Sequence, residues 1–166
     1  MPPRRYVEGF TLVEMVVVIV ITAILSFFAL PRFFQTSSFD ERGFLEESLS
    51  AIRYAQKTAI ASSCDIRVRF TAGTPGSYNI QRWATCVPAN HTAATSDILQ
   101  PDGTPFSATA PDSVSVTALD FYFDRIGQPR EISAATPPLL ITNAADLDVT
   151  IGSSTIQVQP LTGYVE

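Results

Sequence analysis

The segment 10–30, with the sequence FTLVEMVVVIVITAILSFFAL, constrains this chain most, because a single acid, Glu14, interrupts an otherwise uncharged apolar run. Its 21 residues, at about 1.5 Å of rise each, form a helix of roughly 30 Å, which is the thickness of a hydrocarbon core. A carboxylate costs roughly 2.5–3.5 kcal/mol at the centre of a membrane helix and less near an end, where Glu14 lies. The sequence therefore predicts a membrane-spanning helix that tolerates its acid.

Two basic residues, Arg4 and Arg5, precede the apolar run. Positive charges tend to stay in the cytoplasm, so residues 31–166 are expected on the outer side of the membrane. A secretory signal has a shorter apolar core and a small-residue cleavage site, whereas PRFF follows here. The arginine pair also occurs in twin-arginine signals, but the other residues of that motif are missing, which favours simple topology charges.

The sequence GFTLVE at residues 9–14, followed by the apolar run, resembles the N-terminus of type IV prepilins and pseudopilins. The resemblance implies that prepilin peptidase cuts after Gly9 and methylates Phe10, the new N-terminal residue. Glu14 is then the fifth residue of the mature chain, where the family places its acid. Pro31 falls where pilins commonly have a helix-kinking proline.

The resemblance also implies a role for Glu14, which would lie near the α-amine of Phe10 in a neighbouring subunit of an assembled filament. A buried carboxylate is tolerable when it is paired, so the pair is expected to set the register of assembly. The alternative is an ordinary membrane anchor whose Glu14 extends to the interface. That alternative explains neither the Gly9–Phe10 junction nor Pro31.

The segment 31–62 is predicted to form the amphipathic second half of a long helical spine, with bends at Pro31 and Gly43. Its apolar positions recur at three- and four-residue spacing: Phe44, Leu45, Leu49, Ile52, Ala55, Ala59 and Ile60. The charged residues between them, Arg53 among them, are expected to face water or neighbouring subunits.

From residue 63 onward the apolar pattern alternates, which predicts a β-rich head over 63–166. A hairpin is expected from strands at 66–70 and 78–83, followed by a loop over 84–112. Further short strands are expected at 114–117, 119–123, 139–142, 147–151 and 155–159. The fold class is thus α+β and pilin-like, with a leader at 1–9, a transmembrane and filament-core helix at 10–30, and a spine that packs against an antiparallel head.

The chain has two cysteines, Cys64 and Cys86, and an oxidising periplasm favours a disulfide between them. His91 is the single histidine and is expected to be a solvated loop residue. No metal site or cofactor is expected, and nothing places a nucleophile or an oxyanion hole beside His91. The chain is therefore not expected to be an enzyme.

The net charge is −5, and loss of the leader, which carries +1, leaves −6. After Trp83 only two basic residues stand against nine acids, so nucleic-acid binding is disfavoured. Arg67, Arg69 and Arg82 offer a small basic patch beside Trp83, although solvated strand faces look the same. The long loop at 84–112 leaves an adhesin role open.

The function expected from the sequence is that of a minor structural subunit of a type IV pilus. The segments FDRIGQP and IQVQPLTGYV support this more loosely, because they resemble minor pilins and pseudopilins of the H-type branch, including minor subunits of mannose-sensitive haemagglutinin pili. The expected partners are prepilin peptidase, other pilin subunits and the inner-membrane assembly platform. The alternatives are a pseudopilin of a type II secretion system and a ligand-binding subunit for adhesion or DNA uptake. The head would be periplasmic before assembly and lie on a pilus or pseudopilus afterwards.

Overall fold

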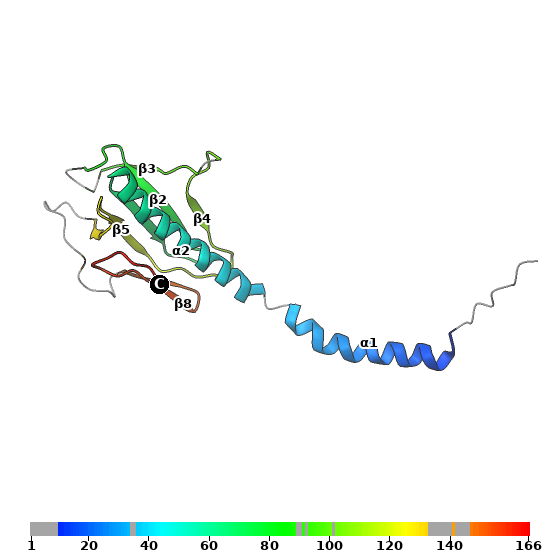
Figure 1. The fold of residues 1–166 in the computed structure, drawn as a ribbon. Helices are drawn as coiled ribbons and strands as arrows, with labels where there is room; N and C mark the ends of the chain where they lie inside the picture. The colour runs from blue at the N-terminus through cyan, green and yellow to red at the C-terminus, as the bar shows by residue number, and fades with distance from the viewer. Residues whose placement is uncertain are drawn as a thin grey trace, which may run out of the picture. The chain divides into compact units, whose positions relative to one another are not determined.

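The computed structural model describes residues 10–33, 36–88, 91, 93–100, 102–132, 141 and 147–166. The chain divides into two compact units, Met1–Thr36 and Ser37–Glu166, and each is described by itself. The first unit contains helix α1 (Leu12–Phe33), and the second contains most of helix α2 (Thr36–Ser62) and all the described strands (Figure 1). In the second unit α2 packs on an antiparallel sheet, so the predicted α+β, pilin-like class is confirmed.

Helix α1 begins at Leu12 because Thr11 caps it. The Thr11 Oγ1 accepts a hydrogen bond from the Glu14 backbone N–H at 3.2 Å, which satisfies one of the free donors of the first turn. The helix continues through Pro31 and ends at Phe33, so the kink expected at Pro31 stays a prediction. Among the residues that the structure describes, no helix combines the length and the apolar character that crossing a bilayer requires. The membrane span predicted over residues 10–30 is therefore not confirmed.

Helix α2 is amphipathic, as the sequence predicts, and it runs through Gly43 without interruption. The side chains that it buries against the sheet are Phe44, Ser48, Ala51, Ile52, Ala55 and Ala59, with Leu45 and Leu49 partly buried. One expectation for this helix was wrong. Ile60 is 51% exposed, because it lies at the rim beside the Gly127 turn. Arg53 is exposed, as expected, and its Nη2 also donates to the Val165 carbonyl at 3.1 Å.

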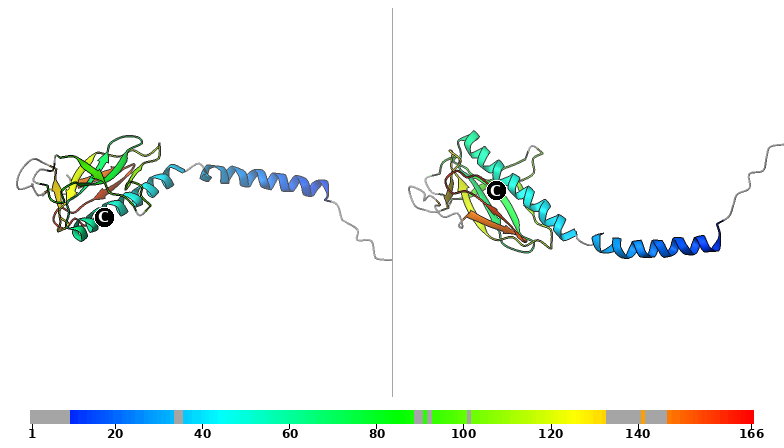
Figure 2. Two further views of the ribbon diagram at one scale, coloured as in Figure 1. Left: turned by 90° about the horizontal axis from the view of Figure 1, so that it is seen from above. Right: turned by 60° about the horizontal axis from the view of Figure 1, so that its bottom comes forward.

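The main sheet has six antiparallel strands in the order β3-β2-β1-β5-β6, with β4 also paired to β2. The predicted hairpin is confirmed as β1 (Ile66–Thr71) and β2 (Ser77–Trp83), and the predicted strand β5 (Leu119–Phe123) pairs with the other edge of β1. Helix α2 lies along one face of this sheet in each view (Figure 2).

Three short strands were not predicted from the sequence. β3 (Thr95–Asp97) and β4 (Ser107–Thr109) both lie within the segment predicted as a loop, and both pair with β2. Each has three mostly polar residues, too few to show an alternating pattern. β6 (Pro129–Glu131) begins with a proline, which a strand tolerates at its first position and at a sheet edge.

The C-terminal region forms a separate two-stranded sheet from β7 (Asp148–Ile151) and β8 (Ser154–Gln157), close to the predicted strands. The strand expected at 114–117 is reduced to isolated bridges from Val116 to Gly73 and to Ile151. The strand expected at 139–142 lies outside the described residues, except for residue 141. One hydrophobic core unites α2 with both sheets, so the second unit has a single interior.

The start of α2 is attached to the turn between β7 and β8 through Glu41. Its Oε1 accepts hydrogen bonds from the Ser153 N–H at 2.8 Å and the Ser153 hydroxyl at 2.7 Å. These bonds from Ser153 lower the pKa of Glu41, with a smaller contribution from Ser154. The contact therefore stabilises the fold most when the carboxylate is charged.

Substituting Glu41→Gln should reduce stability in a pH-dependent way. Because the pKa of Glu41 is lower in the folded chain, its contribution is present above the unfolded pKa and is lost as pH falls through the folded pKa. The melting temperature of the full chain in detergent, measured from about pH 7 to about pH 3, should show a gap between wild type and variant that closes toward acid pH. The exposed Glu46→Gln is the matched control. An equal gap at every pH would contradict the linkage.

Candidate assembly site

The N-terminal end of α1 holds the residues that the sequence singled out for processing and assembly. Phe10 lies just before the helix and is 72% exposed. Thr11 and Glu14 have the spacing of a capping box, and the backbone half of that motif is formed at 3.2 Å. The Glu14 carboxylate thus belongs to the first turn of α1, where the helix dipole favours a negative charge.

The described surface of α1 is apolar on all sides. Its large apolar side chains from Leu12 to Phe27 are exposed by between 46% (Val16) and 80% (Leu12). The hydroxyls of Thr22 and Ser26 donate to carbonyls one turn earlier, at 2.7 and 2.8 Å, so they add little polar character. A helix that is apolar all round requires an apolar environment, either lipid or other helices.

Just after the C-terminal end of α2, a disulfide joins Cys64 to Cys86, the pair that the sequence singled out. The Asp65 N–H donates to the Cys86 carbonyl at 2.7 Å, so a backbone hydrogen bond lies next to the covalent bond. Together they fix where the chain leaves β2 relative to the start of β1.

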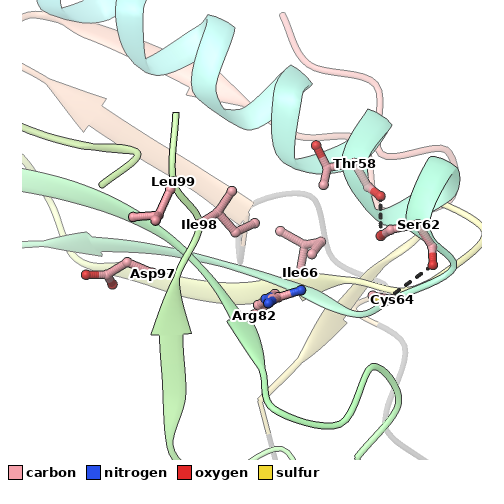
Figure 3. A pocket seen from close by; sticks show the side chains of 8 residues that line it. All are labelled: Thr58, Ser62, Cys64, Ile66, Arg82, Asp97, Ile98 and Leu99. Carbon is pink, nitrogen blue, oxygen red and sulfur yellow. Dashed lines mark hydrogen bonds between the residues drawn. The ribbon is translucent and has the colours of Figure 1, made fainter. Parts of the chain in front are cut away.

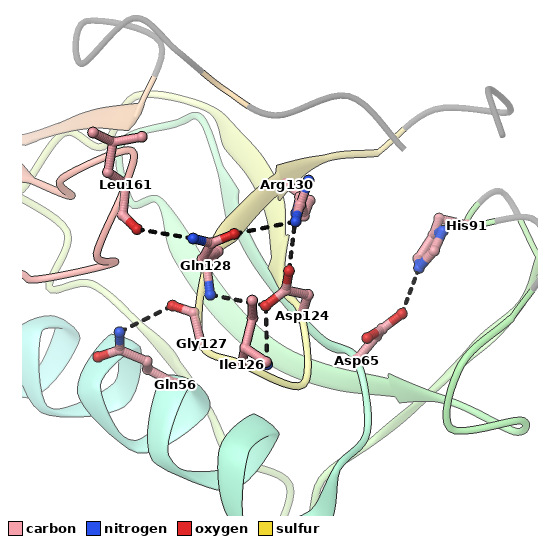
Figure 4. A network of polar contacts seen from close by, with 9 residues as sticks. All are labelled: Gln56, Asp65, His91, Asp124, Ile126, Gly127, Gln128, Arg130 and Leu161. Carbon is pink, nitrogen blue, oxygen red and sulfur yellow. Dashed lines mark hydrogen bonds and ion pairs between the residues drawn. The ribbon is translucent and has the colours of Figure 1, made fainter. Parts of the chain in front are cut away.

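The expectation that His91 is solvated was wrong. His91 is 3% exposed, and its Nε2 lies 2.8 Å from Asp65 Oδ2 (Figure 4). Its ring stacks on Tyr122 at a centroid distance of 4.0 Å and meets the edge of Trp83 at 4.8 Å. Burial, and secondarily the charge of Asp65, raise the pKa of the Tyr122 hydroxyl. The histidine therefore anchors a loop to the sheet face opposite α2.

The basic patch that the sequence suggested does not form. Arg67 is bound to Asp120, with Nε to Oδ1 at 2.8 Å, and this hydrogen bond raises the pKa of Arg67. Arg82 is paired with Ile66, the residue before Arg67. Because successive side chains of a strand point to opposite faces, Arg82 lies on the opposite face of the sheet from Arg67. Trp83 is 2% exposed and so offers no stacking surface. The patch interpretation for DNA binding thus loses its basis.

A polar network holds the β5–β6 turn and the C-terminal segment against α2 (Figure 4). Asp124 Oδ1 accepts hydrogen bonds from the Ile126 and Gln128 N–H groups, and its Oδ2 lies 2.9 Å from Arg130 Nε. Asp124 therefore holds the β5–β6 turn together and pairs with Arg130.

The Gln56 amide links the same turn to the C-terminal segment. Its Nε2 donates to the Gly127 carbonyl at 3.0 Å and to the Thr162 carbonyl at 2.8 Å. The sequence analysis missed this residue, because glutamine on an amphipathic helix gives no signal of its own. The only available hint was the turn sequence around Gly127, whose φ of +83° suits glycine.

Comparison with known proteins supplies a finding about the N-terminus. Residues 4–30 match the family described as the prokaryotic N-terminal methylation motif. The chain carries the type IV prepilin and pseudopilin signature. Proteins of this family are structural pilins that are processed by prepilin peptidase and assemble with other pilin subunits. No curated protein and no solved structure matches the chain.

The structure places some of the residues that this signature implicates. Phe10 and Glu14 lie at the start of α1, and Pro31 lies in its last turn. Gly9, the residue before the expected cleavage point, lies outside the described residues. Cleavage, methylation and a registering role for Glu14 therefore stay predictions.

Removing the disulfide should destabilise the head. In the chain-entropy account, a bond that closes a loop of 22 positions contributes about 3 kcal/mol to the free energy of unfolding. The double variant Cys64→Ser, Cys86→Ser should lose about that amount in urea unfolding of the full chain in detergent. Reduction of the wild-type protein should give the same loss. A variant as stable as the oxidised protein would contradict the expectation.

Proposed function

We propose that this chain is a minor structural subunit of a type IV pilus. It is cut after Gly9, methylated on Phe10 and assembled into the filament through α1. The observation that carries the proposal is the methylation motif at 4–30 together with a helix whose described apolar side chains are all exposed. The looser likeness of FDRIGQP and IQVQPLTGYV to minor pilins supports the minor role.

Before assembly, the subunit is held at the inner membrane by its N-terminal segment, with the head in the periplasm. Arg4 and Arg5 support this orientation, because positive charges favour the cytoplasmic side. The Cys64–Cys86 bond agrees with it, since disulfides persist in oxidising compartments. During assembly, α1 leaves the membrane and packs against the helices of neighbouring subunits. This step requires the inner-membrane assembly platform.

Glu14 sets the register of assembly by pairing with the α-amine of Phe10 in a neighbouring subunit. It is the only charged residue between positions 10 and 31, so any other buried arrangement leaves a carboxylate without a partner. An unpaired buried charge is costly. The position of the subunit in the filament that is most favourable is therefore the one in which Glu14 meets the neighbour's α-amine. Registration, more than affinity, is the contribution of this pair.

A pseudopilin of a type II secretion system is the second candidate, because pseudopilins carry the same signature. Both candidates share processing, membrane anchorage and assembly through α1. The genes next to this one distinguish them: pilus genes support the first candidate and secretion genes the second.

Substituting Glu14→Ala should lower incorporation into sheared filaments by about tenfold or more, because the buried amine of the neighbour loses its partner. The amount of subunit in filament and membrane fractions, measured by immunoblot in the native host, gives the result. Membrane levels should stay at the wild-type value. Glu46→Ala, which removes an exposed acid from α2, should incorporate normally. Wild-type incorporation of the Glu14 variant would refute the registration role.

A further inference from the structure

Arg82 is the one charged residue that the three central strands, β2, β1 and β5, direct to the face covered by α2. It lies directly opposite Ile66 in the β1–β2 register, and residues in such a pair share a face. Ile66 is 1% exposed, and Ile80, two positions before Arg82, is fully buried. Tyr78 of the same face contacts Phe44 of α2. Arg82 itself is exposed, so a cation marks the solvent-facing edge of this otherwise apolar face.

Arg82 lies in a pocket of about 360 Å³ at the C-terminal end of α2 (Figure 3). The size is within the range of ligand and side-chain pockets. Ile66, Ile98 and Leu99 supply apolar lining, and Thr58 and Ser62 come from the last turns of the helix. Leu99 is 58% exposed and marks the rim.

Within the described part of the chain, the Arg82 guanidinium has neither a hydrogen bond nor an ion pair. Asp97 also lines the pocket, but its Oδ1 accepts hydrogen bonds from Asn79 at 3.1 Å and Gln81 at 2.9 Å. Asn79 and Gln81 alternate with Arg82 along β2, so they draw the Asp97 carboxylate toward the other face. The Ser62 hydroxyl donates to the Thr58 carbonyl. The pocket therefore presents one unpaired cation beside apolar walls.

We propose that this pocket is a docking site for a segment of a neighbouring pilus subunit, in which an aliphatic side chain enters between Ile98 and Leu99 and an adjacent Asp or Glu pairs with Arg82. The inference rests on the proposed function, which supplies the neighbouring subunit. Charge complementarity selects the occupant, because a guanidinium binds a carboxylate in a bidentate manner. A purely apolar segment would cover the cation without compensation.

A phosphate polymer fits this site less well. Nucleic-acid grooves have several cations along a track, whereas this pocket has one cation in an acidic chain. The aliphatic lining also favours a peptide side chain over a base, since no aromatic ring is among the described residues that line the pocket.

The test is photo-crosslinking in filaments, with p-benzoyl-phenylalanine in place of Ser96 in the full chain, because Ser96 is exposed, lies opposite Arg82 in the β2–β3 register and is not part of the pocket lining. Mass spectrometry of sheared filaments should identify an adduct with another pilus subunit, at a segment where an aliphatic residue neighbours Asp or Glu. Arg82→Gln should lower the adduct yield by about tenfold, the effect of losing one hydrogen-bonded charge pair. Arg69→Gln, which removes an exposed cation from the other face, should leave the yield unchanged. Melting of the Arg82 variant at the wild-type temperature shows that the head is intact.

An adduct segment without an acidic residue, or a yield that Arg82→Gln leaves unchanged, would overturn the inference. So would a wild-type level of the chain in filaments with no adduct at the Ser96 position. These results leave the proposed function standing. Absence of the chain from filaments would instead overturn the proposed function, and the inference with it.

Discussion

The packing of α2 against the central sheet is the interaction on which the rest of the head depends. Ala51, Ala55 and Ala59 are fully buried, and these small side chains let the helix backbone approach the strands closely. The position of the helix then determines the peripheral contacts. Polar side chains of α2 reach the β7–β8 turn, the β5–β6 turn and the C-terminal segment, so displacement of the helix would release all three.

The two helices use the same secondary structure in opposite ways. α2 buries one stripe and keeps polar residues elsewhere, whereas the described apolar side chains of α1 are all exposed. This contrast supports the proposed function, in which α2 stabilises the fold of one subunit and α1 contacts neighbouring subunits. In the proposed filament, the capped start of α1 then has a special place, because Glu14 brings the only charge of the segment 10–31 into the apolar assembly.

The sequence was informative where a pattern extended over many residues. The methylation motif, the stripe of α2 and the alternation in β1 and β2 all have enough positions to be recognised. It failed where tertiary contacts alone decide the structure. β3 and β4 are strands because β2 offers them an edge, and His91 is buried because Asp65 and Tyr122 lie beneath its loop. Arg53 and Gln56 likewise find partners more than 70 positions away, which no local pattern reveals.

The intact mass of the protein from its native host tests the central claim, processing as a pilin, most directly. The account predicts a chain that begins at Phe10 with one added methyl group and that gains two hydrogens on reduction of the Cys64–Cys86 bond. A chain that retains residues 1–9 in cells with active prepilin peptidase would contradict the account. Glu14 would then be an unexplained acid in an ordinary anchor, and the filament interpretation would be lost.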